Sequence, residues 1–354
     1  MMQVYNRDQY REWDNKVLSF NDYDVYYLSG YVEGFRLHGD GEPTLLYYDE
    51  GGIKAMCVLM LRDIADSEMF STHLPKHQYY DAITPYGYGG FIVEGNITAD
   101  AIKAIYSDYI NTLRKLSVVS VFFRFHPILN NAHTFDGLSN IIDLGQTVHI
   151  DLTSKESIWD NFEGRNRTSI RKAIKSGVVI KHDSSEETIR RFIELYNATM
   201  DHDQADAYYY FDNDFYNSIL TDLPDNHTFF YAELDGAIIS CAIILHGNKQ
   251  MHYHLSGSDY RFRNISPSNL LLYKAACWGV EMGYVTFHLG GGVGSQKDSL
   301  FKFKQSFNKN VSNQFSIGYD IIDQERYDEL VELRSRIDEN FDRSSTFFPL
   351  YRAN

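Results

Sequence analysis

Histidine and tyrosine side chains gather in one segment of the C-terminal half, at spacings that suit proton transfer. His252 and His254 are two residues apart, so on a β-strand both imidazoles point to one face and Tyr253 points to the other. His288 lies on the strand that we predict beside this one. An imidazole titrates near neutral pH and can accept a proton from a substrate. We therefore take His254, His288 and Tyr253 as candidate catalytic residues, with satisfied structural histidines as the alternative.

The same histidines could in principle bind a metal ion, together with His246 on the neighbouring hairpin. The chain contains neither a Cys-x-x-Cys nor a His-Glu-x-x-His pattern, which are the usual signatures of such sites. We therefore expect no metal.

Two lysines alternate with phenylalanines in residues 301–307, FKFKQSF. In an extended segment Lys302 and Lys304 would share one face, and the phenylalanines would anchor the segment. An ammonium group can hold a substrate carboxylate or phosphate, or stabilise a departing group, and Asp298 could orient it. We take Lys304 as a candidate catalytic residue and Lys302 as a candidate substrate-binding residue. The alternative is an amphipathic edge strand with solvated lysines.

A strand, a helix and a second strand must position these groups. The segment KQMHYHLSGS predicts the first strand, and YVTFHL predicts the second. Between them a helix is expected with Ser266 as N-cap, Pro267 at its first position and Gly283 at its end. Its first turn, which includes Asn269, would offer free N–H groups to a phosphate or a carbonyl, and the strand 252–256 could offer others. Asn269 is therefore a candidate substrate-binding residue.

The second strand runs into a glycine-rich loop, residues 290–294. An α/β protein usually binds its ligand where a strand ends in such a loop. The glycines match neither G-x-x-x-x-G-K-[ST] nor G-x-G-x-x-G. We therefore exclude nucleotide hydrolysis and dinucleotide binding.

Two segments of the chain align without a gap. Residues 44–61 read TLLYYDEGGIKAMCVLML and residues 228–245 read TFFYAELDGAIISCAIIL, and each predicts a β-hairpin. In both halves a helix and a strand follow, and Thr98 is the expected cap of the first such helix. Unrelated hairpins can show the same degree of identity by chance. The repeated order of elements nevertheless predicts a tandem duplication of one α/β domain.

The domain boundary is expected near residue 147, before a helix that Thr153 and Glu156 would open as a capping box. We predict an N-terminal domain over residues 1–147 and a C-terminal domain over residues 148–319. The tail, residues 320–354, is expected to pack on the first domain.

A basic stripe lies just after this boundary. Residues 164–182 contain no acidic side chain, and Arg167, Arg171 and Lys175 recur every four residues, which places them on one face of a helix. Like charges at this spacing destabilise a helix. Arg167 and Arg171 are therefore candidate ligands for a phosphate or another anion. The alternative is a solvated face that balances acids on a neighbouring element.

Composition limits the class of protein. A chain of 354 residues is long enough for two domains, and its net charge of −15 disfavours a large phosphate-rich partner. It contains no apolar run of roughly 18 residues, and its start lacks the apolar core of a signal peptide. The three cysteines lie in apolar segments, which is typical of reduced thiols. We therefore expect a cytoplasmic protein without a transmembrane segment.

The order of several motifs resembles one family. The helix NRTSIRKAIKSGV, the strand YHLSGS, the helix SPSNLLLYKAACWG, the strand FHLGGG and the segment FKFKQSF are arranged as in the Fem-type (FemAB-like) aminoacyltransferases, which belong to the GNAT superfamily. The resemblance covers roughly residues 40–320 and includes DAITPYGYGG in the first half. It implies an α/β protein with two tandem GNAT-like domains, each a mixed, mostly antiparallel sheet flanked by helices.

The resemblance also implies an activity, the transfer of an acyl or aminoacyl group to an amine. In Fem-type enzymes the donor is aminoacyl-tRNA and the acceptor is a peptidoglycan precursor peptide, while relatives use acyl-CoA. The lysine of their Phe-Lys-x-x-Phe segment lies in the substrate site, and here it is Lys304. A small molecule, a cell-wall precursor or an amino sugar is the expected acceptor. Net charge and the absence of a heptad run for a tRNA-binding arm favour acyl-CoA over tRNA.

Other candidate substrate-binding residues come from the first half and from a tyrosine-rich segment. Tyr86 and Tyr88, flanked by glycines, would form an aromatic wall, or alternatively a plain hairpin turn. Arg124 lies on a predicted strand of the first domain, and Tyr209 lies in MDHDQADAYYYF.

The sequence departs from the family pattern at two places. The usual GNAT pyrophosphate loop would fall on RFRNIS, which keeps Arg261 but has Asn264 and Ser266 in place of glycines. His202 occupies a position where relatives often have arginine. A second hypothesis, of another class, is a non-catalytic duplicated GNAT module that binds an anionic sugar or peptide.

Overall fold

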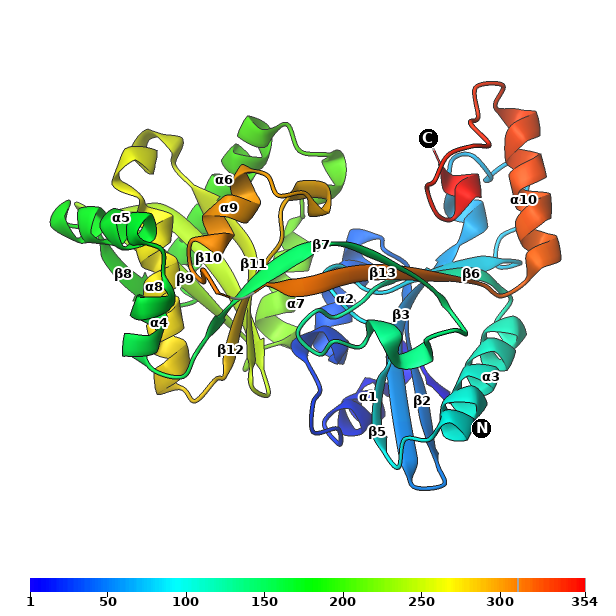
Figure 1. Ribbon diagram of the computed structural model, residues 1–354. Coiled ribbons are helices and arrows are strands. Elements are labelled where there is room, and N and C mark those ends of the chain that lie inside the picture. The colour runs from blue at the N-terminus through cyan, green and yellow to red at the C-terminus, as the bar shows by residue number, and fades with distance from the viewer. Residues whose placement is uncertain (311, 354) are drawn as a thin grey trace. The chain divides into compact units, whose positions relative to one another are not determined.

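The computed structural model describes residues 1–310 and 312–353 (Figure 1). The chain divides into two compact units: unit 1 is Met1–Leu144 with Phe315–Asn354, and unit 2 is Gly145–Gln314. The strands β7 (Asn140–Asp151) and β13 (Asn313–Ile321) contain the two points at which the chain passes between the units. Each unit is a mixed, mostly antiparallel sheet with helices packed on it, as predicted.

In unit 1 the strands pair in the order β1-β2-β3-β4-β6-β13, with β5 also paired to β3. The β4–β6 pair is parallel and the other pairs are antiparallel. The elements are β1 (Gln3–Tyr5), η1 (Arg7–Gln9), α1 (Tyr10–Val17), η2 (Val25–Tyr27), α2 (Ser29–His38), β2 (Glu42–Glu50), β3 (Ile53–Asp63), η3 (Ile64–Asp66), β4 (Tyr80–Ile83), β5 (Ile92–Gly95), α3 (Ala99–Lys115), β6 (Val118–Arg124), η4 (Ala132–Phe135), α10 (Gln324–Ile337) and η8 (Leu350–Arg352).

In unit 2 the order is β7-β12-β11-β10-β9-β8, and the parallel pair is β11–β12. The elements are α4 (Lys155–Asn161), α5 (Gly164–Lys175), β8 (Val179–His182), α6 (Glu186–Asp203), η5 (Ala207–Tyr209), α7 (Asn213–Asp222), β9 (His227–Leu234), β10 (Ala237–Gly247), β11 (Gln250–Ser258), η6 (Tyr260–Ile265), α8 (Pro267–Glu281), β12 (Thr286–Gly290), η7 (Val293–Ser295) and α9 (Ser299–Gln305).

The predicted internal repeat is visible in the order of elements. The aligned segments form the antiparallel hairpins β2–β3 and β9–β10, and a helix and a strand that completes a parallel pair follow each hairpin. The two hairpin turns have the same geometry, because the aligned Gly52 and Gly236 have φ values of 78° and 80°. A left-handed conformation of this kind favours glycine, so the turn explains the shared residue.

The core of unit 2 lies between its sheet and the helices α5 and α8. Ile170 and Ala173 of α5 and Leu271 of α8 are buried against strand residues such as Phe230 and Ala242. In unit 1, α3 covers the sheet in the same way, and α10 and the C-terminal residues form a second apolar cluster. None of the helices in the described part of the chain has the length and apolar character that crossing a bilayer requires.

Three local predictions were wrong and one was confirmed. Ser154, not Thr153, caps α4, since its hydroxyl accepts the N–H of Ser157. Residues 299–305 form helix α9 rather than an extended segment, because Asp298 caps its first turn; Lys302 and Lys304 therefore do not share a face. The structure confirms Thr98 as the cap of α3.

Ser266 precedes α8 as expected, with Pro267 at the first helical position. Its backbone is left-handed, however, with φ 57°, and its side chain makes no capping hydrogen bond. The predicted capping role of Ser266 was therefore wrong, although the position of the helix start was right.

Candidate functional site

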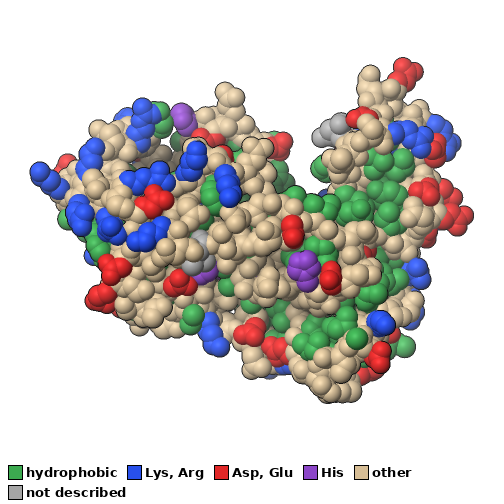
Figure 2. Space-filling model, in the orientation of Figure 1, with side chains coloured by type: hydrophobic (Ala, Val, Ile, Leu, Met, Phe, Trp, Pro, Cys, Tyr) green, Lys and Arg blue, Asp and Glu red, His purple; other side chains and the backbone are tan. Residues whose placement is uncertain are grey.

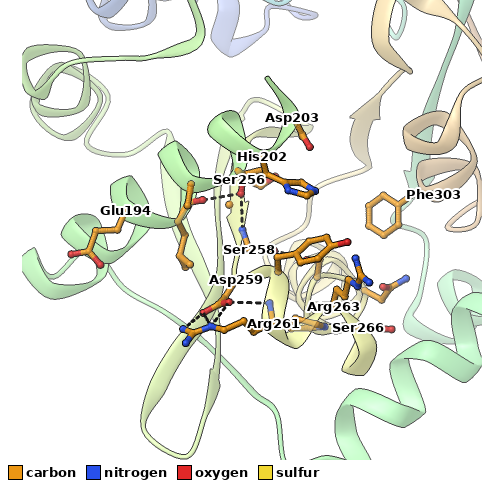
Figure 3. Close-up of a pocket in the computed structure, with 18 of the residues that line it drawn as sticks. Glu194, His202, Asp203, Ser256, Ser258, Asp259, Arg261, Arg263, Ser266 and Phe303 are labelled. Atoms are coloured by element: carbon orange, nitrogen blue, oxygen red, sulfur yellow. Dashed lines mark hydrogen bonds and ion pairs between the residues drawn. The ribbon is translucent and has the colours of Figure 1, made fainter. Parts of the chain in front are cut away.

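Unit 2 contains a pocket of about 720 Å³ at the C-terminal end of β11. Its walls come from α6, the end of β11, η6, the first turn of α8 and one residue of α9. Figure 3 shows His202 from α6 and Phe303 from α9 pointing toward the same space. The polar and charged lining includes Arg191, Glu194, Thr199, His202, Asp203, Ser256, Ser258, Asp259, Arg261, Arg263, Ser266, Ser268 and Asn269.

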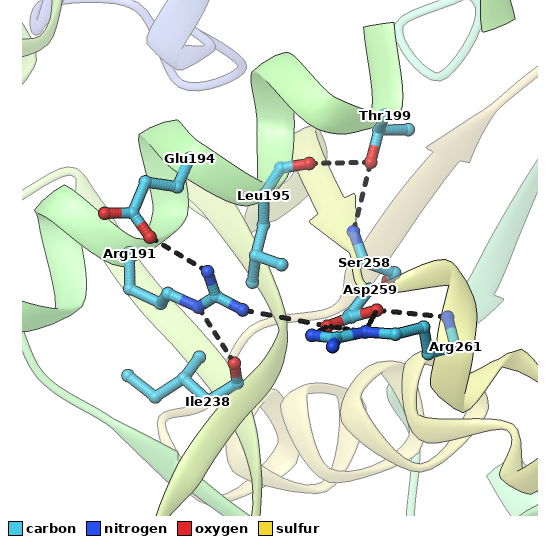
Figure 4. Close-up of polar contacts among 8 residues, drawn as sticks. All are labelled: Arg191, Glu194, Leu195, Thr199, Ile238, Ser258, Asp259 and Arg261. Atoms are coloured by element: carbon cyan, nitrogen blue, oxygen red, sulfur yellow. Dashed lines mark hydrogen bonds and ion pairs between the residues drawn. The ribbon is translucent and has the colours of Figure 1, made fainter. Parts of the chain in front are cut away.

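A close approach of β11 to α6 forms the floor of the pocket. A Cβ added at Gly257 would lie 2.3 Å from the backbone of Leu195, so a larger residue does not fit there. The backbone N–H of Ser258 donates to Oγ1 of Thr199 at 3.2 Å, and the Thr199 hydroxyl donates to the Leu195 carbonyl at 2.8 Å (Figure 4). The Thr199 side chain therefore links β11 to α6, next to Gly257, where the two elements come into close contact.

Asp259 organises the charged side of the pocket. Its carboxylate accepts the backbone N–H of Arg261 and pairs with the Arg261 guanidinium at 2.6 Å, while Arg191 lies 3.9 Å away (Figure 4). Hydrogen bonds from Arg261 lower the pKa of this carboxyl. Arg191 also donates to the Ile238 carbonyl and pairs with Glu194 at 2.8 Å. Arg191 and Arg261 are thus held by the carboxylates of Asp259 and Glu194.

Three serine hydroxyls join the start of α8 to the sheet. Oγ of Ser258 lies 2.7 Å from that of Ser240 and 2.9 Å from that of Ser268. Ser240 and Ser268 are 3.2 Å apart. Asn269 in the same turn donates to Asn166 of α5 at 2.9 Å. The first turn of α8, which lines the pocket, is therefore held from both sides.

An aromatic group marks the outer edge of the pocket. Tyr260 is 52% exposed; its ring centroid is 4.5 Å from that of His202, and the Arg263 guanidinium lies 3.9 Å from it. Deeper in the pocket, the Tyr253 hydroxyl donates to Oγ of Ser256 at 2.7 Å. Burial raises the pKa of Tyr253, so its phenol remains protonated at neutral pH.

Lys304 lies outside the pocket lining, although the adjacent Phe303 belongs to it. Its Nζ donates to the Gly291 carbonyl at 2.7 Å, in the glycine-rich loop. Burial lowers the pKa of Lys304 to about 8, and the charge of Asp298 opposes the shift. The ammonium group is thus held against the backbone rather than in bulk water.

The predicted histidine strand contains a β-bulge. Tyr253 pairs with Ile244 and Leu255 with Ile243, so His254 is the extra residue and the regular alternation of the strand is interrupted. Burial lowers the pKa of His254 to about 3, which keeps this imidazole neutral. His252 pairs with His288 on β12, as predicted, with ring centroids 5.8 Å apart.

The structure places the other candidates of unit 2 away from the pocket lining. Arg167 donates to the Phe162 carbonyl at 2.7 Å and to the Trp159 carbonyl at 3.1 Å, so it binds the C-terminal end of α4. The Arg171 guanidinium lies 5.1 Å from the Trp159 ring. Lys302 is exposed on α9, and Tyr209 is exposed in η5. Of the predicted site residues, only Tyr253 and Asn269 line the pocket.

The candidates in unit 1 belong to an aromatic cluster. Tyr86 stacks on Phe35 at 5.4 Å and its carbonyl accepts the Tyr31 hydroxyl at 2.6 Å. Tyr88 packs edge-on against Tyr26 at 5.8 Å. Arg124 lies at the end of β6, with its guanidinium 5.5 Å from the ring of Phe122.

Sequence reasoning missed most of the pocket. It singled out the segment RFRNIS, which covers most of η6 and the residue before α8, but not the contributions of Thr199 or Ser258. Thr199 and His202 are three residues apart on α6, a spacing that places two polar side chains on one helix face. That spacing was the signal available for Thr199, but it indicates a site only once α6 is known to approach β11.

The comparisons with known proteins identify the fold around this pocket. Residues 161–304 match the family model described as an acetyltransferase (GNAT) domain. This segment is therefore similar to a GNAT domain. No curated protein matches the chain. The pocket therefore lies within the matched segment, between the end of β11 and the start of α8.

Solved structures extend the similarity to both units. FemX matches with a TM-score of 0.67 at 15% identity, over 92% of this chain and 99% of that one. A conserved protein of unknown function from Bacteroides thetaiotaomicron has a TM-score of 0.59 at 9% identity, over 90% of this chain and 100% of that one. At these identities the matches show the fold alone, which this chain shares with FemX.

A third match is a C-terminal domain from Agrobacterium fabrum that is named for lysylphosphatidylglycerol synthetase. It has a TM-score of 0.53 at 14% identity, and covers 89% of this chain and 92% of that one. This likeness, too, is one of fold alone.

Proposed function

We propose that the protein is an N-acyltransferase that moves an acyl or aminoacyl group from a CoA thioester or an aminoacyl-tRNA to an amine. The pocket in the GNAT domain supports this proposal most directly. It brings together the start of a helix, two arginines at the outer edge and a protonated phenol. A helix start and arginines suit the phosphates of either donor.

The chemistry requires a neutral amine and a stabilised oxyanion. The amine nitrogen attacks the carbonyl carbon, a C–N bond forms, and the C–S or C–O bond to the donor breaks. The amine loses one proton, and the departing thiolate or alkoxide takes up one. Tyr253 is the residue in the pocket suited to donate that proton, because burial keeps its phenol protonated.

Among donors we favour acyl-CoA. The absence of a heptad run still argues against an arm that grips tRNA. The negative net charge of the chain argues less strongly against tRNA than expected, because most of the excess negative charge lies in unit 1. Unit 1 has 16 Lys and Arg against 28 Asp and Glu, and unit 2 has 17 against 20.

For the acceptor we propose a cell-wall precursor peptide or an amino sugar, with Lys304 near the reacting amine. Support comes from the position of Phe303 in the pocket lining and from the buried ammonium of its neighbour Lys304. One observation favours the second candidate function, a non-catalytic binding module. His254, His288 and Lys304 are all absent from the pocket lining.

The test supplies each donor to the purified protein with a panel of amine acceptors and measures acyl transfer by mass spectrometry. Lys304→Met is expected to reduce kcat by roughly 100-fold, comparable to removing one catalytic hydrogen-bond donor. Lys302→Met, two residues away and exposed, is the matched control and should retain activity. If the wild-type protein binds a donor but transfers no acyl group, the binding module is favoured. If it neither binds a donor nor transfers an acyl group, the proposal is refuted.

A further inference from the structure

The charges of unit 2 are unevenly distributed. The unit carries a net charge of only −3, against −12 for unit 1, and residues 164–182 contain six basic and no acidic side chains. Figure 2 shows Lys and Arg side chains gathered over the region of unit 2 that includes α5. A basic face is therefore present in a protein that is strongly acidic overall.

The cations on the outer face of α5 lack acidic partners. Arg171, Lys172 and Lys175 are exposed, and none of them forms an ion pair with any residue that the structure describes. Several other cations of unit 2 do form ion pairs, as in Lys155–Glu281, Lys181–Glu233, Arg190–Glu194 and Arg261–Asp259.

The packing of α5 does not require these three cations. Ile170 and Ala173 anchor the helix in the core, and Arg167 binds the carbonyls of α4. Arg171, Lys172 and Lys175 lie within one turn of each other, where like charges destabilise a helix. An anionic partner outside the chain would remove that cost.

Two apolar side chains adjoin this face in the sequence. Ile174 of α5 is 52% exposed, and Val179 at the start of β8 is 53% exposed. Gly177 between them has φ 86°, which turns the chain sharply from the helix into the strand. Exposed aliphatic groups next to unpaired cations are typical of a surface that rests on lipid headgroups. A nucleic acid, by contrast, would contact the cations through its phosphates and would not need the aliphatic side chains.

We propose that Arg171, Lys172, Lys175, Ile174 and Val179 form a docking surface for anionic phospholipid headgroups. The cations contact lipid phosphates, and the two aliphatic side chains enter the boundary between headgroups and acyl chains. The surface would hold unit 2 at a membrane, whatever reaction its pocket catalyses. The inference is thus independent of the acyltransferase proposal.

The first test measures sedimentation of the full chain with vesicles of phosphatidylcholine, alone or mixed with phosphatidylglycerol. We expect binding only to the mixed vesicles, decreasing as salt increases. Each basic residue near such a surface contributes roughly fivefold, so R171Q/K172Q/K175Q should bind on the order of 100-fold more weakly. The control K155Q/R190Q/K249Q removes the same charge elsewhere in unit 2 and should bind like the wild type. Equal binding by the R171Q/K172Q/K175Q variant and the wild type would overturn the proposal.

The second test separates lipid from nucleic acid. The variant I174S/V179S keeps every charge, so it should lose vesicle binding by roughly tenfold while its affinity for a mixed-sequence RNA is unchanged. RNA binding that depends on the three cations, in a protein that does not bind vesicles, would assign the surface to nucleic acid and overturn the proposal. Circular dichroism of each variant controls for folding, and all five side chains are exposed enough to be replaced without unfolding.

Discussion

The two units share an order of elements but differ in what lies beside one of their helices. In unit 2 a pocket of about 720 Å³ lies between α6 and β11. In unit 1 Tyr31 and Phe35 of α2 pack in series with Tyr26 and Tyr86 at centroid distances of 5.0 to 5.4 Å. The comparison teaches that the same order of elements can surround an open space or a packed aromatic cluster, depending on the side chains.

The two units also differ in where their polar side chains lie. Unit 1 buries a charged cluster in which Asp81 contacts both Arg62 and Arg352, whereas the polar groups of unit 2 gather around the pocket. This pattern suggests that unit 1 is built for stability and unit 2 for binding. Four variants test that distinction, and they are described from the largest expected effect to the smallest.

Asp81→Asn should destabilise unit 1 most. The carboxylate is 1% exposed and pairs with two arginines, so its loss leaves two partly buried cations without their partner. We expect the free energy of unfolding to fall by about 4 kcal/mol, measured by urea denaturation. Asp66→Asn, at an exposed ion pair with Lys76, is the control and should change it by less than about 1 kcal/mol. Similar effects of the two changes would show that the buried charged cluster does not stabilise unit 1.

Gly257→Ala should close the floor of the pocket in unit 2. The new Cβ would lie 2.3 Å from backbone atoms of α6. Backbone atoms cannot relieve such a clash by a change of rotamer, as a side chain can. Overpacking of this kind costs about 3 kcal/mol, which calorimetry would detect, and donor binding should be lost. Gly164→Ala has open space around it and should leave both stability and binding intact. A stable, binding-competent G257A protein would show that α6 and β11 do not form the site.

Lowering the pH should destabilise unit 2, because it protonates the His246 imidazole. Burial lowers the pKa of this imidazole to about 4, and its ring nitrogens lie 2.9 Å from the Tyr284 hydroxyl and 3.0 Å from that of Thr228. The unfolded chain binds the proton more tightly, so this contribution is complete above about pH 6.5 and is lost as pH falls toward 4.

The expected loss over that range is on the order of 3 kcal/mol, followed by urea denaturation at several pH values. His246→Gln should flatten the dependence by about that amount. His73→Gln is a control outside the network, since His73 is exposed in unit 1, and it should leave the curve unchanged. An unaltered pH profile in the His246 variant would rule out this imidazole as the cause.

Ser240→Ala should have the smallest effect. It removes one hydroxyl from the serine cluster and leaves Ser258 and Ser268 bonded to each other, at a cost of about 1 kcal/mol. The gap-free alignment places Met56 of unit 1 opposite Ser240. Ser240→Met, which copies unit 1, should therefore block donor binding, whereas Ser240→Ala should weaken it only a few-fold in calorimetric titration.

Much of the fold could be predicted from local patterns. The hairpins, the helix from Pro267 and the capped helix after Thr98 have strong periodicity or clear boundary residues. Residues 299–305 were misjudged because alternating Lys and Phe suit a strand, while a seven-residue helix depends on the cap from Asp298. Likewise, the bulge at His254 could not be predicted from the spacing of two histidines.

The sequence alone determined the duplicated α/β architecture and the basic face of α5, since hydrophobic period and charge order are local properties of the chain. Only the tertiary structure decided which residues form the pocket. Thr199 lies far from Gly257 and Ser268 in the sequence, and they meet because β11 carries no side chain where α6 crosses it. The physical reason is that a cavity forms where packed elements leave a space that no side chain occupies. A local sequence pattern does not show which elements pack together.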